Sequence, residues 1–293
     1  MSKSRYETGG NWYKGNTHIH STVSDGGKNF AELAEIYSEL SYDFLYHADH
    51  WAASSTETDT NEYPLLWLDG IEIDGSDSND SYYHIVCLGK FTGINREMGL
   101  DEAIKQTRAQ GGLIILAHPF WTGNSIEDAF SWDFDGVEIY NHVTHWLNGK
   151  SDSLVFWNMM LGKNPNILGF SVDDAHIRPE HPGYNGGWIM VNCKELNSES
   201  ITEAIRAGNF YSSCGPEFHE IKCSGNTVTI KTSSIQFARL VGPAYQGFRA
   251  GSFEGSLITE AAFEIPDSWE YAYLEIEDKN GKRAWTNPLF VAE

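Results

Sequence analysis

Two histidines near the start of the chain have the spacing of a metal-chelating pair. His18 and His20 lie in the segment Asn-Thr-His-Ile-His-Ser-Thr-Val-Ser-Asp-Gly. Residues i and i+2 of a β-strand point to the same face, so both imidazoles can reach one ion. Asp25, the aspartate of this segment, precedes a helical pattern and can fold back over the same place. The segment therefore predicts part of a metal site.

More metal-capable side chains interrupt or end short apolar segments. One apolar segment ends in Asp49-His50, and another, Leu-Ile-Ile-Leu-Ala-His, ends in His118. The other members of this set are Glu72, His84, Asp174 and His176. Imidazole and carboxylate together suit zinc, manganese or iron. Because the chemistry of parallel barrels gathers at the C-terminal ends of the strands, we expect these side chains to meet at one mouth.

Strand-like and helical patterns alternate through the first two thirds of the chain. Helices are predicted over Phe30–Leu40, Leu100–Gln110 and Ser198–Ala207. Strands are predicted over Thr17–His20, Phe44–Ala48, Ile71–Ile73, His84–Leu88, Leu113–Ala117, Gly136–Tyr140 and Leu168–Ser171. This alternation predicts an α/β fold with a parallel sheet built from βα units.

The pattern changes after the segment Cys-Gly-Pro at residues 214–216. Short alternating segments follow, among them Phe237–Val241 and Tyr271–Ile276, and turn residues separate them. Such a pattern predicts a small all-β sandwich. The chain is therefore divided into residues 1–214, which carry the metal-capable side chains, and residues 215–293, the β-domain.

The composition restricts the partners. Lys and Arg number 20 against 41 Asp and Glu, so the net charge is −21, which argues against extended nucleic acid or an anionic membrane. A small anionic ester remains compatible as a substrate, because bound cations reverse the local charge. No apolar run approaches the ~20 residues of a membrane helix, and no secretory signal is visible. With four cysteines and no CxxC pair, we expect a cytoplasmic protein; oligomerisation stays open.

The metal-capable motifs, in this order, resemble those of the PHP (polymerase and histidinol phosphatase) superfamily of metallohydrolases. They are His-x-His with Ser-Asp-Gly, Asp-His, a strand Glu, His-x-x-x-x-Gly, Ala-His-Pro and Asp-Ala-His. Segments around residues 205–217 and 283–291 also resemble a carbaryl-hydrolase-like subgroup with a C-terminal β-domain. The resemblance implies a distorted (β/α)7 barrel followed by a small β-sandwich, with a cluster of two or three divalent transition metals.

The resemblance also implies which residues bind each metal. Glu72 would bridge the first and second ions, and the further ligands implied are His18, His20 and Asp174 for the first ion, His84 and His118 for the second, and Asp25, His50 and His176 for the third. Some PHP members have a histidine where Asp25 stands, which leaves the occupancy of the third position open. His47 stands where the family usually has an apolar residue and is interpreted as structural.

The predicted reaction is hydrolysis of a small phosphate mono- or diester by a metal-activated hydroxide. Expected catalytic residues are Glu72, Asp174, His176 and Arg178; the arginine could bind a phosphate oxygen bidentately or form a loop salt bridge. The same hydroxide could instead attack a carbamate, aryl ester or amide. A non-catalytic metal- or glycan-binding protein is the third hypothesis.

Other side chains near these motifs could support the site. Asp49 could orient a ligand imidazole, and Glu138 is interpreted as a hydrogen-bonding structural carboxylate or a further candidate. Side chains that could shape the substrate pocket are Trp51, Trp121, Tyr140, His142, His145, Trp146 and Tyr184.

Overall fold

The computed structural model describes residues 4–6, 9–52 and 62–291. A five-stranded sheet has the order β4 (Gly70–Ser76), β5 (Tyr82–Leu88), β6 (Leu113–Leu116), β7 (Gly136–Asn141) and β8 (Leu168–Val172). Strands β6, β7 and β8 are parallel, but β5 is antiparallel to both β4 and β6. The expectation of a parallel sheet is therefore wrong at β5. The reason is the short turn over residues 77–81, since so short a connection joins only antiparallel strands.

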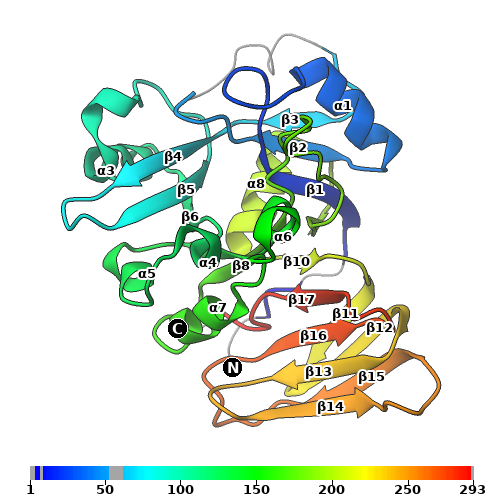
Figure 1. Ribbon diagram of the computed structural model, residues 1–293. Coiled ribbons are helices and arrows are strands. Elements are labelled where there is room, and N and C mark those ends of the chain that lie inside the picture. The colour runs from blue at the N-terminus through cyan, green and yellow to red at the C-terminus, as the bar shows by residue number, and fades with distance from the viewer. Residues whose placement is uncertain (1–3, 7–8, 53–61, 292–293) are drawn as a thin grey trace.

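A nine-stranded sheet runs through the length of the molecule (Figure 1). Its order is β14 (Gly247–Gly251), β13 (Phe237–Val241), β16 (Tyr273–Glu277), β17 (Arg283–Thr286), β10 (Phe210–Ser213), β9 (Trp188–Cys193), β1 (Asn11–Ile19), β2 (Phe44–His47) and β3 (Leu66–Leu68). Strand β10 pairs with β17, so backbone hydrogen bonds cross the boundary predicted at residues 214 and 215. The division into two domains there stays a prediction.

The nine-stranded sheet approaches the five-stranded sheet beside both outer strands of the latter, β4 and β8, without a continuous ladder of hydrogen bonds between the two sheets. In the described residues, single bridges join Ile19 to Ala175 and His50 to Glu72. The predicted α/β class is confirmed, whereas no closed barrel forms from the described strands. Both bridges lie at the predicted metal site, so the sheets meet where the ligands are.

The three helices expected from the sequence are present as α1 (Phe30–Glu39), α3 (Leu100–Ala109) and α8 (Ser198–Ala207). Helix α1 begins with a capping box, in which the side chains of Asn29 and Glu32 each accept a hydrogen bond from the other's backbone N–H. The shorter helices are η1 (Arg96–Met98), α4 (Pro119–Thr122), α5 (Asp128–Ser131), α6 (His142–Asn148) and α7 (Leu154–Leu161). None of the described helices has the length and apolar composition needed to cross a bilayer.

The C-terminal segment contains two sheets with a shared core. Strands β11 (Phe218–Ser224), β12 (Thr227–Ile235) and β15 (Ile258–Glu264) form an antiparallel sheet of three. Val228 and Ile230 of this sheet belong to the same buried cluster as Leu240 and Leu274 of the nine-stranded sheet. Figure 1 shows the two layers facing each other below the metal-site part of the fold. This is the arrangement of a β-sandwich.

Candidate metal centre

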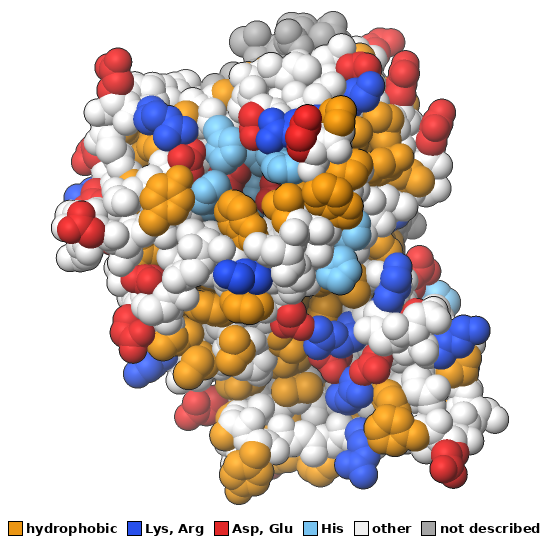
Figure 2. Space-filling view, viewed as in Figure 1, with side chains coloured by type: hydrophobic (Ala, Val, Ile, Leu, Met, Phe, Trp, Pro, Cys, Tyr) orange, Lys and Arg blue, Asp and Glu red, His pale blue; other side chains and the backbone are white. Residues whose placement is uncertain are grey.

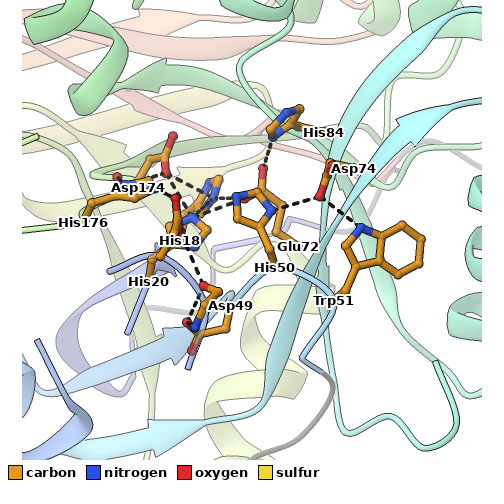
Figure 3. Close-up of polar contacts among 12 residues, drawn as sticks. His18, His20, Asp49, His50, Trp51, Glu72, Asp74, His84, Asp174 and His176 are labelled. Atoms are coloured by element: carbon orange, nitrogen blue, oxygen red, sulfur yellow. Dashed lines mark hydrogen bonds and ion pairs between the residues drawn. The ribbon is translucent and has the colours of Figure 1, made fainter. Parts of the chain in front are cut away.

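The predicted ligands come from six strands and converge at one edge of the two sheets (Figure 3). His18 lies near the end of β1 and His20 directly follows that strand, while His118 and Asp174 follow β6 and β8. His84 lies near the start of β5 instead of its end. Because β5 runs antiparallel to β4 and β6, the start of β5 lies beside the end of β6, where the other candidate ligands gather. The reversed strand thus explains how a residue near the start of β5 reaches the other candidate ligands.

The first compact group consists of His18 Nε2, His20 Nε2, Glu72 Oε2 and Asp174 Oδ1. The two nitrogens are 3.1 Å apart. They lie 3.1 and 3.2 Å from the Glu72 oxygen, and 3.4 and 3.2 Å from the Asp174 oxygen. Ligand atoms bonded to one zinc ion at about 2.0 Å lie about 3.3 Å apart when their arrangement is tetrahedral. The five separations above fall near that value, and His18, His20 and Glu72 form a compact set of donors with Asp174 beside two of them. The four side chains are therefore candidates for binding one divalent ion.

The other oxygens of the same two carboxylates face a second group. Glu72 Oε1 lies 2.7 Å from His84 Nδ1 and 3.6 Å from His118 Nε2. The same His118 nitrogen is 3.7 Å from Asp174 Oδ2. Each carboxylate therefore presents one oxygen to the first group and its second oxygen to His118. This is the arrangement that a carboxylate needs to bridge two ions.

A third group forms beside His20. Asp25 Oδ2 lies 3.2 Å from His176 Nε2, and Asp25 Oδ1 lies 3.5 Å from His20 Nδ1. Together with His50, these side chains offer ligand atoms that all lie within 4.8 Å of one another. Gly26 permits the close approach of this loop, because a Cβ there would lie 2.2 Å from the carbonyl oxygen of His20. The structure thus brings together all three ligands predicted for a third ion, with His20 as a fourth.

Charges of both signs compensate one another in the cluster. Burial by itself would lower the pKa of His20, but hydrogen bonds to Asp174 and Glu72 outweigh it and raise the pKa to about 9. For His18, burial is likewise outweighed by the nearby carboxylates, and its pKa lies well above the usual value. Burial would raise the pKa values of Glu72 and Asp174, yet the surrounding histidines hold both well below their ordinary range. The carboxylates are therefore ionised, and a bound cation would displace protons from the histidines.

The residues present fit a metal cluster by a further criterion. The side chains of His18, His20 and Glu72 are at most 1% exposed. The buried Nδ1 of His20 has no hydrogen-bond partner, an arrangement that costs free energy unless another group satisfies the atom. An imidazole that binds an ion through Nε2 carries its proton on Nδ1, and the Asp25 carboxylate 3.5 Å away is the acceptor that faces this nitrogen.

Glu138 holds two of the ligands in place. Its Oε1 lies 2.6 Å from His18 Nδ1, which leaves His18 Nε2 facing the cluster. Its Oε2 accepts hydrogen bonds from the backbone N–H of His118 and from the Asn141 side-chain amide, both at 2.9 Å. The amide of Asn141 also donates to Asp174 Oδ2 at 3.2 Å. The interpretation of Glu138 as a structural hydrogen-bonding carboxylate is confirmed, and its effect is to orient the ligands.

The prediction that Asp49 orients a ligand imidazole is wrong. Its carboxylate accepts hydrogen bonds from the backbone and hydroxyl groups of Ser21 and Ser24, and so holds the loop that carries Asp25. Asp74, which the sequence analysis missed, is the carboxylate beside the His50 imidazole.

Asp74 lies two residues after Glu72 on β4. Its Oδ1 is 3.1 Å from His50 Nδ1, an ion-pair contact outside hydrogen-bond geometry. It also accepts hydrogen bonds from Trp51 Nε1 at 3.0 Å and from Arg96, which binds its two oxygens at 2.9 and 3.0 Å. The strand spacing of i and i+2, which identified His18 and His20, would also have identified Asp74.

A cavity of about 190 Å³ opens onto the cluster. Figure 2 shows histidine side chains in a hollow with hydrophobic side chains beside it. Of the side chains expected to shape the pocket, Trp121 lines this cavity, whereas Trp51 contacts Asp74 and the other five are absent from its described lining. His181, which was not predicted, also lines it.

Arg178 lies beside the third group. Its Nη1 donates to the carbonyl oxygen of Asp25 at 2.7 Å, and its Nη2 is 3.7 Å from Asp25 Oδ2. Of the two roles expected for Arg178, phosphate binding or a salt bridge within the loop, these contacts correspond to the salt bridge. They also hold the Asp25 loop against the segment that carries His176.

Comparison with known proteins shows similarity to solved structures. No model of a known protein family matches the chain, and no curated protein matches it. A two-domain protein from Bacteroides vulgatus containing a predicted PHP-like metal-dependent phosphoesterase is 14% identical, with a TM-score of 0.55 over 98% of both chains.

Two looser similarities cover about two thirds of this chain. A Bifidobacterium adolescentis protein named as a metal-dependent phosphoesterase is 14% identical over 66% of this chain and 96% of its own, with a TM-score of 0.45. An amidohydrolase from Chromobacterium violaceum is 14% identical over 67% of this chain and 96% of its own, with a TM-score of 0.42.

The likeness to the Bacteroides vulgatus protein extends over nearly all of both chains. This chain therefore shares the overall fold of that protein. The resemblance to the PHP superfamily is confirmed at the level of the fold, and the carbaryl-hydrolase-like subgroup stays a prediction.

Proposed function

We propose that this protein is a metal-dependent phosphoesterase that hydrolyses a small phosphate mono- or diester. The observation that carries the proposal is the set of three overlapping ligand groups among the described residues, which share His20, His50 and Glu72. A fold in common with a protein that contains a predicted PHP-like metal-dependent phosphoesterase supports it.

The proposed ligands combine these groups with Asp174 and His118, whose side chains lie 3.2–3.7 Å from members of the groups. The first ion would be held by His18, His20, Glu72 and Asp174, and the second by Glu72, His84 and His118. Asp25, His50 and His176 would hold a third, with His20 beside them. Zinc, manganese and iron all suit imidazole and carboxylate donors. We propose two or three such ions per chain.

Bound divalent ions would supply a nucleophile from water at neutral pH and would stabilise the charge that develops on the phosphoryl group. The protein's own residues fix where this happens. Glu72 and Asp174 point one oxygen to each of two ligand groups and so set the separation of the ions. Arg178 and His176 lie on the Asp25 side of the cavity, where the arginine would leave its loop contact to bind a phosphate oxygen. The new bond joins the water oxygen to phosphorus, the ester P–O bond breaks, and the water proton passes to the alcohol.

The proposed setting of this activity follows from composition. A net charge of −21 and four unpaired cysteines support a small anionic ester as the partner, in a reducing cytoplasm. Extended nucleic acid and membrane surfaces are not proposed as partners, because both are polyanionic.

Hydrolysis of a carbamate or aryl ester at the same site is the second candidate. Trp121, Val143 and Leu147 in the cavity lining favour it, since they offer an apolar surface to an aromatic group. The chemistry would then occur at carbonyl carbon instead of phosphorus.

The first test is the metal content of protein purified without chelator, measured by mass spectrometry, followed by a panel of phosphate esters, aryl esters and carbamates. We expect two or three transition-metal ions per chain and turnover of phosphate esters. Glu72→Ala should lose metal and activity together, whereas Glu39→Ala, which removes an exposed carboxylate of α1, should lose neither. A metal-free Glu72→Ala variant with full activity would overturn the proposal, and turnover of carbon esters alone would support the second candidate.

A further inference from the structure

The cavity over the metal centre has two walls of different chemistry. One consists of the candidate metal ligands. The other comes from α4 and α6 and includes Trp121, Val143 and Leu147, which we call the apolar wall. Thr144 also lines the cavity, but its hydroxyl is engaged with the backbone carbonyl oxygens of Asn141 and Lys150. The α6 side of the cavity therefore presents an almost wholly apolar surface to a ligand.

Trp121 stands directly beside the second ligand group. Its ring lies edge to face with His118 at 5.1 Å between centroids and with His84 at 5.9 Å. A phosphate held between the first two ion positions would therefore have its ester oxygen within reach of this indole. Val143 is 2% exposed, so helix packing fixes this part of the wall before any ligand arrives.

The cavity offers no additional positive charge. Among the residues that line it in the described part of the chain, none is Lys or Arg. Arg178, beside the third group, contacts Asp25 and in the proposed reaction would bind the phosphate that is hydrolysed, so it supplies no charge for a second anionic group. A second phosphate or a carboxylate on the substrate would face Trp121 and Leu147 without a counter-charge, and burying an unpaired charge is costly.

The volume limits the size of the substrate. About 190 Å³ corresponds to roughly six water molecules at about 30 Å³ each. That is below the usual range for sites that hold drug-sized ligands, which begins at about 300 Å³. The cavity is open to solvent, and its part beside the candidate ligands has room for one phosphoryl group and one compact substituent.

We infer that the apolar wall binds the leaving group, and that the substrate is the monophosphate ester of a compact aromatic or apolar alcohol. This inference rests on the proposed phosphoesterase function. It excludes sugar phosphates and nucleoside polyphosphates as preferred substrates, because their hydroxyl and phosphate groups would be desolvated against the wall.

The test compares two phosphonates, which have no ester bond to hydrolyse, on the metal-loaded full-length protein. Calorimetry gives the dissociation constants of phenylphosphonate and methylphosphonate. We expect phenylphosphonate to bind at least about tenfold more tightly, the scale on which hydrophobic pockets discriminate even one methylene. Trp121→Ala should reduce this ratio to below about threefold while changing methylphosphonate binding little.

Two further variants make the test specific. Leu147→Ala changes the wall without touching His84 or His118, and it replaces Trp121→Ala if that variant loses metal. Trp146→Ala is the matched control, since Trp146 is 51% exposed on the same helix and lies outside the described cavity lining. Metal content is measured for every variant.

The outcomes separate this inference from the proposed function. Equal dissociation constants for the two phosphonates, or a ratio that neither wall variant changes, would overturn the apolar wall as a leaving-group site. The proposed phosphoesterase function would still be supported in that case, because the protein binds the phosphonate group. A metal-loaded protein that binds neither phosphonate overturns both. The inference is supported if the preference for phenylphosphonate over methylphosphonate falls in Trp121→Ala or Leu147→Ala and stays unchanged in Trp146→Ala.

Discussion

Replacement of Asp74 by asparagine should weaken the binding of one metal ion without unfolding the protein. The carboxylate lies 3.1 Å from His50 Nδ1, and Arg96 and Trp51 hold it in place with hydrogen bonds of 2.9–3.0 Å. Burial would raise the pKa of Asp74, but His50 and Arg96 outweigh it and keep the pKa well below its usual range. Asp74 is therefore ionised wherever the protein is folded near neutral pH. Asn removes this charge and keeps the size of the side chain.

The distances give limits for how much metal affinity the Asp74→Asn variant should lose. A carboxylate 3.1 Å from a fully charged imidazolium would interact with it by about 5 kcal/mol at an effective dielectric constant of about 20. This is an upper limit, since His50 is charged only when it is protonated and Arg96 already neutralises part of the Asp74 charge. Loss of a partner that orients a metal-bound histidine costs about 10–100-fold in metal affinity, or about 1.4–2.7 kcal/mol. We expect a loss in this range for the ion that His50 binds.

The assay is a competition of the protein with a coloured chelator, which resolves the affinity of the weakest-bound ion. Asp133→Asn is the control, because it removes the same charge from an exposed position that is absent from the described cavity lining. Asp74→Glu should restore part of the affinity, since it restores the charge. If Asp74→Asn binds every ion as tightly as the unmodified protein, His50 either is no ligand or needs no carboxylate to orient it.

Three further predictions concern protons and packing. Metal binding at pH 7 should release protons, because the pKa of His20 is raised to about 9; calorimetry in two buffers of different ionisation enthalpy measures this, and equal heats would contradict it. In chelator-treated protein, the raised pKa of His20 stabilises the fold fully below about pH 6.5 and loses this effect as pH rises through about 9. Its Tm should therefore fall over that interval, whereas Glu72 and Asp174, whose pKa values are lowered, lose their contribution only in acid; a constant Tm would refute this assignment. Trp157→Ala, at a fully buried side chain that donates to the carbonyl oxygen of Ile167, should lower the free energy of unfolding by about 3–5 kcal/mol in urea titrations monitored by circular dichroism, and a loss below about 1 kcal/mol would contradict its core role.

The ligand set was predictable because it depends on local periodicity. His18 and His20 share a strand face, and His118 and Asp174 each lie two residues after the end of an apolar strand. Asp74 has the same relation to Glu72 as His20 has to His18, but it lies in a run of acidic residues that resembles a solvated loop. Its role depends on contact with Arg96, twenty-two positions away. No local pattern reveals such a partner.

The sheet topology could not be predicted for a related reason. Alternating strands and helices favour parallel βα units, and β6, β7 and β8 follow that rule. The short turn between β4 and β5 reverses one strand, and β9, β10 and β17 extend the other sheet into the C-terminal part. Which strands pair across such distances depends on side chains that meet only in the folded molecule, and a one-residue shift in register would expose the buried face.

The backbone at two of the candidate ligands is strained, and the neighbouring strand supports it. His118 and Asp174 have φ values of 26° and 55°, a left-handed conformation that costs about 1–3 kcal/mol for residues other than glycine. Glu138 accepts a hydrogen bond from the backbone of His118, and Asn141 donates one to the side chain of Asp174. These contacts come from β7, which lies between β6 and β8 in the sheet. Two residues of β7 therefore help to hold the strained backbone of His118 and the side chain of Asp174 in the positions of these candidate ligands.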